Sequence, residues 1–392
     1  MQRKRCNLCF AGIIDYASEV KNKQKVISEF WNSLKTGIQL QPLITSPNGR
    51  DYRTVSKRKA FITNRVFQLG LIGVDDDSLK NYPLPVEHCA IEPQLHAEVY
   101  NAVQEYLRKK DSKSLAEQFN YVIVKGNNDE ASVIFNVTSF SSENRKAINH
   151  LSKSITARVK NVQGVFVFVD EERSRYYLSD RPKRDDIKRG NSITKIYGRD
   201  KLFHKVGDLK FLYSVPSFSQ TNHFILDLFL STAEEFLELS ADDTLYDLYC
   251  GYGLFSISLA KKAGRVIGME VSRDSIKDAI ENAKRNSVAN AHFISTNINL
   301  ENLQKSLKPK SNNIKLLLDP PRSGTASGVI ECLAAYNPEK VLHIFCNMDI
   351  VERELSRWKN CGYTVVKAQP FDMFPGTSEI ELMVALTRNG KI

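Results

Sequence analysis

Long apolar runs are absent from this chain of 392 residues, and no apolar stretch of signal-peptide length follows its basic first residues. The most continuous apolar runs, such as residues 165–169, are far too short to cross a bilayer. Cysteine is scarce and odd in number, at seven. We therefore expect a protein of the reducing cytoplasm, with no membrane-spanning segment and no structural disulfides.

Internal repeats and low-complexity tracts are absent too, which argues against a solenoid or a disordered chain. Apolar residues make up 42% of the chain, enough for a sizeable core, beside 26% charged residues. The length favours two domains. We expect an α+β domain over residues 1–214 and an α/β domain over residues 215–392.

Positive charge is concentrated in the first half of the chain. Residues 1–200 hold 33 Lys and Arg against 23 Asp and Glu, whereas residues 201–392 hold 22 of each. Basic clusters at residues 57–59, 108–110 and 181–189 have the spacing to follow a phosphate backbone, although a solvated surface explains any single cluster. The asymmetry favours a polyanionic partner, and by itself it does not separate RNA from an acidic membrane.

Apolar periodicity predicts helices and strands that alternate irregularly in the first half. The helices are expected at Ser18–Leu34, Leu95–Arg108 and Asn144–Arg158, and the strands at Tyr121–Val124, Ser132–Val137 and Val162–Val169.

The second half alternates apolar runs with helical patterns, which is typical of a doubly wound α/β sheet. After an amphipathic stretch at residues 223–239, strands are expected at Thr244–Tyr249, Val266–Met269, His292–Ser295, Ile314–Leu318, Val341–Phe345, Thr364–Ala368 and Ile380–Leu386. Ligand sites in such sheets lie beyond the carboxyl ends of the strands.

A glycine loop follows the first of these strands. Residues 247–253 read Asp-Leu-Tyr-Cys-Gly-Tyr-Gly, and glycine lets the backbone approach a ligand without a Cβ in the way. Glu270 ends the next strand, where an acidic residue of nucleotide-binding folds accepts hydrogen bonds from a ribose diol. A plain turn and an exposed carboxylate are the simpler interpretations. A phosphate-binding P-loop is excluded because no Gly-Lys-Ser/Thr follows the glycines.

Further motifs stand at later strand ends. They are Asp-Pro-Pro-Arg at residues 319–322, Phe-Cys-Asn at residues 345–347 and Asp-Met-Phe-Pro-Gly-Thr-Ser-Glu-Ile-Glu at residues 372–381. With Phe-Ser-Gln-Thr-Asn at residues 218–222 and the glycine loop, these motifs resemble the RNA uracil-5-methyltransferase family. The resemblance spans about residues 216–386 and is closest to members without an N-terminal OB-like RNA-binding domain. It implies a class I (Rossmann-like) methyltransferase domain preceded by an α+β RNA-binding domain.

The reaction of that family explains a cysteine and a carboxylate. Carbon 5 of uracil is a poor nucleophile until a thiolate adds to carbon 6, and a base must later remove the proton from carbon 5. The resemblance implies that Cys346 is the nucleophile and Glu381 the base. Without the motif, Cys346 would read as an inert buried cysteine. Glu379 is expected to be an exposed strand residue.

The resemblance also implies a pocket for S-adenosylmethionine. Its expected lining is Gln220, Tyr249, Glu270 and Asp319, with Asn297 at the adenine edge. Arg322 after the two prolines argues against RNA cytosine-5 methyltransferases, which carry a cysteine there. The uridine must leave its stack to react, so the partner is expected to be structured RNA with a loop or a remodelled helix.

Cys6, Cys9 and Cys89 resemble the cysteines that hold a [4Fe–4S] cluster in many members of the family. The family pattern has a further cysteine before the close pair, and none precedes Cys6. A cluster with a foreign fourth ligand, a zinc ion and a remnant all remain open. These cysteines favour ribosomal RNA over transfer RNA. A non-catalytic RNA-binding or assembly protein is the alternative from a different class, and no obligate protein partner is evident.

Overall fold

The computed structural model describes residues 9–74, 81–173, 193–307 and 313–388. Two compact units divide the chain: unit 1 is Met1–Ile13 with Asn48–Leu202, and unit 2 is Ile14–Pro47 with Phe203–Ile392. This division differs from the expected one at residue 214. Residues 14–47 pack against the C-terminal strands, and β9 (Leu209–Ser214) is hydrogen-bonded to helix α8 of unit 2.

Unit 1 contains a seven-stranded sheet in the order β3-β2-β1-β4-β5-β6-β7. The neighbouring strands are antiparallel except β5 and β6, which run parallel because helix α4 connects them. The strands are β1 (Val55–Thr63), β2 (Val66–Val74), β3 (Asn81–Pro85), β4 (Phe119–Gly126), β5 (Ala131–Val137), β6 (Val162–Val169) and β7 (Thr194–Gly198).

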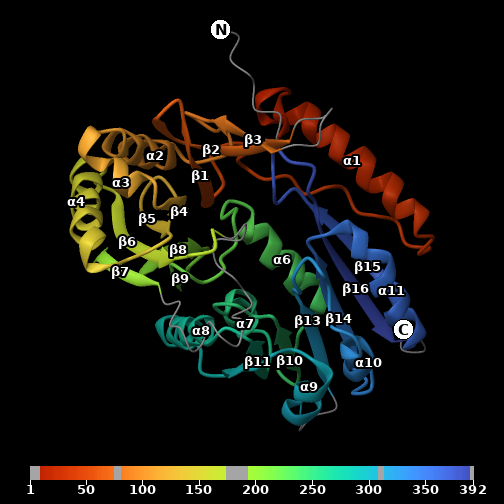
Figure 1. Ribbon diagram of the computed structural model, residues 1–392. Coiled ribbons are helices and arrows are strands. Elements are labelled where there is room, and N and C mark those ends of the chain that lie inside the picture. Colours follow the sequence, from red (N-terminus) through yellow and green to blue (C-terminus); the bar gives the residue numbers. More distant parts are fainter. Residues whose placement is uncertain (1–8, 75–80, 174–192, 308–312, 389–392) are drawn as a thin grey trace. The chain divides into compact units, whose positions relative to one another are not determined.

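Two helices of unit 1, α2 (Gln94–Leu107) and α4 (Ser142–Arg158), pack on this sheet (Figure 1). Val99 and Val103 of α2 and Leu151 of α4 are fully buried against β4 and β5. The short helix α3 (Lys113–Ala116) completes this layer. The predicted α+β character of the first half is thus confirmed, with more strands than the sequence indicated.

Unit 2 contains the second seven-stranded sheet, in the order β12-β11-β10-β13-β14-β16-β15. Five strands are parallel, and β16 is antiparallel to both of its neighbours. The strands are β10 (Thr244–Leu248), β11 (Arg265–Glu270), β12 (Ala291–Ser295), β13 (Ile314–Leu318), β14 (Lys340–Phe345), β15 (Tyr363–Phe371) and β16 (Glu381–Arg388), and a two-stranded sheet pairs β8 (Lys201–Val206) with β9.

Helices connect the strands of this sheet and confirm the predicted doubly wound, Rossmann-like architecture. They are α6 (Leu226–Leu237), α7 (Leu254–Leu259), α8 (Arg273–Arg285), α9 (Leu300–Ser306), α10 (Val329–Ala334) and α11 (Val351–Asn360). The chain order reverses between β10 and β13, which is the switch point where such sheets bind ligands.

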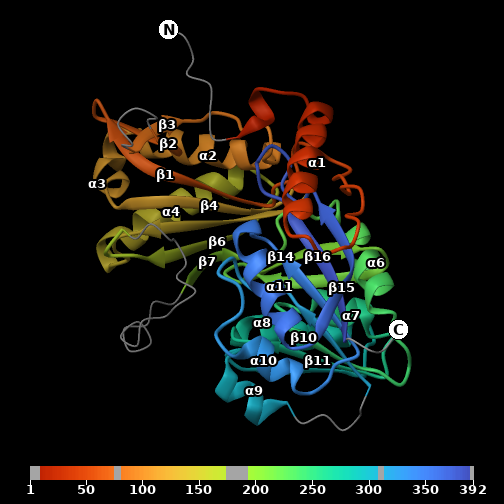
Figure 2. The same cartoon turned by 90° about the vertical axis from the view of Figure 1, so that its right-hand side faces the viewer.

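Helix α1 (Tyr16–Ser33) belongs to unit 2 and lies against its C-terminal strands (Figure 2). It begins at Asp15, whose side chain accepts a hydrogen bond from the Ser18 amide. Trp31 is 1% exposed and packs in the core of this sheet. Residues 41–44 then follow β15, with Ile44 N donating to Pro370 O at 3.0 Å.

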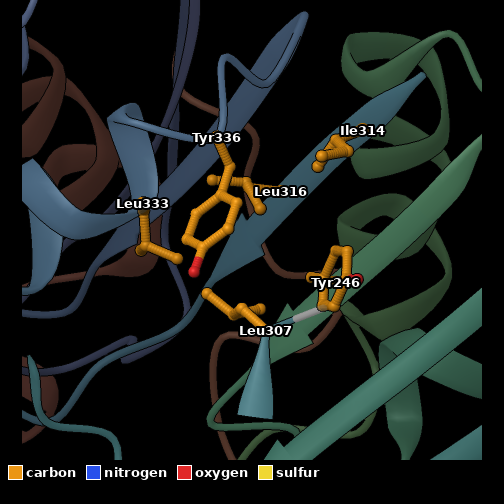
Figure 3. Close-up of a pocket in the computed structure, with 6 residues that line it drawn as sticks. All are labelled: Tyr246, Leu307, Ile314, Leu316, Leu333 and Tyr336. Carbon is orange, nitrogen blue, oxygen red and sulfur yellow. The ribbon is translucent and has the colours of Figure 1, made fainter. Parts of the chain in front are cut away.

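The described helices include none with the length and hydropathy that a membrane crossing requires. A cavity of about 10 Å³, the space of a single water molecule, lies in the core of unit 2. Figure 3 shows the side chains that line it, which are Tyr246, Leu307, Ile314, Leu316, Leu333 and Tyr336. None of them is a candidate site residue, so this cavity is a feature of core packing.

Candidate active site

The candidate residues of unit 2 meet at one edge of its sheet. Glu270 ends β11, while Tyr249, Asp319 and Cys346 directly follow β10, β13 and β14. Parallel strands share a carboxyl edge, and antiparallel β16 brings its first residue, Glu381, to the same edge. The register pairs Phe345 with Leu382, so the next position sets Cys346 opposite Glu381. Such cross-strand neighbours project from the same face of a sheet.

The loop after β10 needs its glycines. Tyr249, Gly251 and Gly253 all have positive φ angles, of 67°, 54° and 89°. A Cβ on Gly253 would lie 3.0 Å from the Ile257 Cδ1 atom, so a side chain there would add crowding to backbone strain. Cys250 is 6% exposed and packs inside the unit, as expected of a packing residue.

Two carboxylates flank this loop. Glu270 accepts hydrogen bonds from the Ser272 amide at 2.8 Å and from the Gly251 amide at 3.4 Å. Asp247 is buried and accepts one from the Ser256 hydroxyl at 2.6 Å, whereas its Oδ1 atom has no hydrogen-bond partner among the described residues. Burial, opposed by the Ser256 hydrogen bond and supported by the nearby charges of Asp319 and Glu270, raises the pKa of Asp247 to about 7.

Cys346 shares its surroundings with Asp319 and Glu381. Burial and the two nearby carboxyl groups, opposed by Arg322, raise the pKa of the Cys346 thiol to about 12. Burial raises the pKa of Asp319 to about 7. Burial and the charge of Asp319 hold the pKa of Glu381 well above its usual range. Cys346 and Glu381 therefore remain neutral near pH 7 unless a positive charge is brought close, whereas Asp319 is about half ionised there.

Arg322 and Glu379 form an ion pair at the rim of this site, with 2.9 Å between Nη2 and Oε2. Asn347 donates from Nδ2 to the Arg322 carbonyl at 3.1 Å, which links the loop after β14 to the loop after β13. Glu379 was expected to be an exposed strand residue; its side chain is partly exposed, but the residue is not part of a strand. Glu379 lies before β16, and its ion pair leaves the side chain 39% exposed.

Two expected pocket residues lie in loops. Gln220 is 7% exposed in the segment before α6, and Asn297 is an exposed residue after β12. Asn222, which the sequence analysis did not single out, donates from Nδ2 to Ser46 Oγ at 3.0 Å and to Met373 O at 3.1 Å. Asp247 was also missed as a site residue, although it is the first residue of the glycine motif.

The cysteines of unit 1 are only partly described. Cys6 lies outside the described residues, and Cys9 and Cys89 are half-buried. Burial raises the pKa of Cys89 to about 11, and the charges of Glu92 and Cys9 add to it. No group of three or more His, Cys, Asp or Glu side chains able to hold a metal occurs within residues 9–74, 81–173, 193–307 and 313–388.

Comparison with known proteins gives a family match and similar chains. The family model described as tRNA (Uracil-5-)-methyltransferase matches residues 192–389, half of the chain. A protein of Clostridium acetobutylicum described as an uncharacterized RNA methyltransferase is 26% identical over 401 residues, covering 98% of this chain and 82% of the relative. One of Nanoarchaeum equitans with the same description is 25% identical over 388 residues, covering 98% and 79%.

A solved structure shares the fold of the whole chain. It is the crystal structure of Pyrococcus abyssi tRNA (uracil-54, C5)-methyltransferase in complex with S-adenosyl-L-homocysteine. The TM-score is 0.71 at 18% sequence identity, and the likeness covers 97% of this chain and 86% of that one.

The raised pKa of Asp247 predicts a pH-dependent effect of Asp247→Asn on stability. A carboxyl whose folded pKa of about 7 exceeds its unfolded value, roughly 3.9, stabilises the fold below the lower value and loses that contribution as the pH rises. Without ligand, the substitution should raise the free energy of unfolding by about 2–3 kcal/mol more at pH 8 than at pH 5. Urea unfolding at both pH values measures this.

The exposed Asp242→Asn in the turn before β10 is the matched control and should change stability equally at both pH values. An Asp247→Asn effect that is the same at pH 5 and pH 8 would contradict the raised pKa.

Proposed function

Because the chain belongs to the tRNA (uracil-5-)-methyltransferase family, we propose that it methylates carbon 5 of a uridine in ribosomal RNA, with Cys346 as nucleophile and Glu381 as base. Family membership confirms the expected enzyme class, an S-adenosylmethionine-dependent RNA (uracil-5-)-methyltransferase. The observation that supports the assignment of roles is the register of β14 and β16: its last pair is Phe345 with Leu382, next to Cys346 and Glu381, and the Glu381 charge acts on the Cys346 thiol.

The carboxyl edge of the unit 2 sheet fits S-adenosylmethionine. Asp247, Glu270 and Asp319 interact electrostatically, and one buried oxygen of Asp247 has no hydrogen-bond partner among the described residues. A cationic ligand relieves this repulsion, and S-adenosylmethionine carries a sulfonium and an ammonium group. We assign Gln220, Tyr249, Glu270 and Asp319 to its pocket, with Asn297 at the adenine edge. When bound, it supplies an electrophilic methyl carbon.

Cys346 performs the first step as a thiolate. Its sulfur adds to carbon 6 of the uracil, and the electron pair of the 5,6 double bond moves into an enolate. The raised pKa of the thiol means that this step needs a neighbouring positive charge, which Arg322 and a bound sulfonium provide. Carbon 5 of the enolate would then take the methyl group, while the bond between the methyl carbon and sulfur breaks and its electron pair stays on the departing thioether sulfur.

Glu381 completes the cycle. Its carboxylate takes the proton from carbon 5, the freed electron pair restores the 5,6 double bond, and the bond between carbon 6 and Cys346 sulfur breaks to release the thiolate. One oxygen of Glu381 is buried with no hydrogen-bond partner among the described residues, so it is available to accept that proton.

We assign RNA binding to unit 1 because it contains an excess of basic residues over acidic ones. Of the three basic clusters, residues 108–110 are exposed, and residues 181–189 lie outside the described residues. Arg58 of the cluster at 57–59 is 2% exposed and holds Glu92 at 2.6 Å, so the expectation that it follows a phosphate backbone is wrong. Lys57 is exposed and lies 5.5 Å from the Tyr121 ring centroid.

Two RNA classes are supported by different observations. The resemblance of Cys6, Cys9 and Cys89 to cluster cysteines favours ribosomal RNA, which we place first. The fold likeness to a solved transfer-RNA enzyme favours transfer RNA. The described residues provide two of the three thiols, so we derive no catalytic step through an iron–sulfur cluster.

Methyl transfer to RNA tests the proposal directly. Labelled S-adenosylmethionine is incubated with ribosomal and transfer RNA fractions that lack 5-methyluridine, and the modified nucleoside is identified by mass spectrometry. The wild-type protein should form 5-methyluridine in the ribosomal fraction. Cys346→Ala should lower the rate by at least about 10³-fold, because loss of a covalent nucleophile removes the reaction route.

The control is Cys361→Ala, at the end of α11, which should keep wild-type activity. Product in the transfer RNA fraction alone would reassign the substrate, and 5-methylcytidine would refute the base specificity. Cofactor binding without methylation of any folded or relaxed RNA would favour the non-catalytic alternative.

Substitution of the base predicts a trapped intermediate. Glu381→Gln should still add to carbon 6 and methylate carbon 5 but should not release the RNA, so a protein–RNA adduct that survives denaturant should accumulate. Denaturing gel electrophoresis with labelled RNA measures it. Glu379→Gln is the matched control and should release product normally; an adduct in that variant instead would move the base to Glu379.

Metal analysis tests the cluster hypothesis. Protein purified without oxygen should contain iron and acid-labile sulfide if Cys6, Cys9 and Cys89 hold a cluster, and Cys89→Ser should lower both. Absence of iron and sulfide from the wild-type protein would refute the cluster, and stoichiometric zinc would identify the alternative metal.

A further inference from the structure

Helix α1 carries two buried charged side chains that face the C-terminal loop of unit 2. Lys23 is 5% exposed and Glu19 is 1% exposed. The Lys23 ammonium lies 2.6 Å from Asp372 Oδ1 and 3.3 Å from Glu19 Oε1. Asp372 is fully buried, and burial raises its pKa while Lys23 opposes that change.

These side chains hold the loop of residues 372–380, which leads directly into Glu381. Besides Asp372, Lys23 Nζ donates to the Phe374 carbonyl at 3.0 Å and to the Glu379 carbonyl at 3.3 Å. Glu19 accepts a hydrogen bond from the Gly376 amide. The two side chains thus contact the start, middle and end of the loop.

A second set of contacts holds the first two residues of the same loop, 372 and 373. The Ser46 amide donates to the Tyr16 hydroxyl at 3.0 Å, and Asn222 Nδ2 joins Ser46 Oγ to the Met373 carbonyl. The Asp372 amide donates to Ile44 O at 2.8 Å. Residues 44 and 46 are therefore linked by hydrogen bonds to the start of the loop, directly at Asp372 and through Asn222 at Met373.

We propose that Lys23 and Glu19 are positioning residues for Glu381. By holding the loop before Glu381, α1 fixes the distance between this carboxyl and the proton on carbon 5. The inference rests on the proposed function. Removing charges from water is unfavourable, and apolar residues of similar size often stabilise a fold as well as a buried ion pair does. What the pair supplies and an apolar residue lacks is a fixed set of donors and acceptors along the loop.

The two halves of the reaction depend on this loop to different degrees. Cys346 follows β14, whose neighbours β13 and β16 fix its backbone on both sides. Glu381 is the first residue of β16 and pairs with Phe371 of β15, so the ladder holds its backbone on that side. The loop of residues 372–380 that joins the two strands has no regular structure, and the contacts from α1 hold it in place. Loosening the loop should therefore slow proton removal and product release much more than adduct formation.

Single-turnover reactions of Lys23→Met with the RNA that the wild-type enzyme methylates test this inference. Release of RNA from the adduct should slow on the order of 10²-fold, the effect of a displacement near 1 Å, because a base must lie within hydrogen-bond reach of its proton. Adduct formation and the affinity for S-adenosylmethionine should stay within about twofold of the control. Quenching in denaturant and gel electrophoresis separate adduct from free RNA.

Lys25→Met is the matched control, because Lys25 lies on the same helix with its side chain 75% exposed and should release RNA at the wild-type rate. A merely structural role of Lys23 would slow adduct formation and release together. Equal release rates in folded Lys23→Met and Lys25→Met would overturn the inference.

Two further variants test the same inference if Lys23→Met does not fold. The double variant Lys23→Met with Asp372→Asn removes the charge that the single substitution would leave unpaired at Asp372, and it should also accumulate adduct. Glu19→Gln is isosteric and should slow release by a smaller factor. If both fold and release RNA at the wild-type rate, the inference is wrong. A wild-type protein that methylates no RNA would instead refute the proposed function.

Discussion

The antiparallel insertion of β16 between β14 and β15 is the constraint on which the site depends. In a parallel sheet the ligand binds at the edge formed by the carboxyl ends of the strands. The first residue of a strand therefore normally lies at the opposite edge. Reversal of β16 places Glu381 at the edge shared by Asp319 and Cys346, although their strands are separated along the chain by α11 and β15. The proximity of the proposed nucleophile and the proposed base is thus a consequence of sheet topology.

Burial of that edge gives the site its electrostatic character. Asp247, Asp319 and Glu381 have raised pKa values because each lies in a buried environment near other carboxyl groups. An arrangement of this kind opposes folding at neutral pH, since ionising one group penalises the next. It favours a cationic ligand for the same reason. The repulsion between these carboxyl groups, which the unliganded protein tolerates, therefore favours the binding of a ligand that carries a sulfonium.

The sequence predicted the parts of the fold that depend on local pattern. Strand β13 was predicted with its observed bounds because four of its five residues are apolar and the whole strand is buried, with Lys315 as its one charged residue. Strand β1 was missed because two of its buried positions hold polar Ser56 and Arg58, so the sequence shows no alternation of apolar and polar residues there. The packing of α1 in unit 2 was not predictable from local pattern, since Lys23 and Asp372 are 349 positions apart. The motifs identified Cys346 and Glu381 as candidates. The strand pairing that brings the two residues together is visible only in the folded sheet.

The nucleophile and the base differ in what fixes them. Backbone ladders to β13 and β16 hold the strand before Cys346, and these ladders form with almost any apolar sequence. The loop before Glu381 has no such ladder between residues 372 and 380, so side chains must supply the missing constraint. Lys23, Glu19 and Asn222 do so by bonding to its backbone at Phe374, Gly376 and Met373. A segment near the N-terminus is thereby required for the geometry of a residue near the C-terminus.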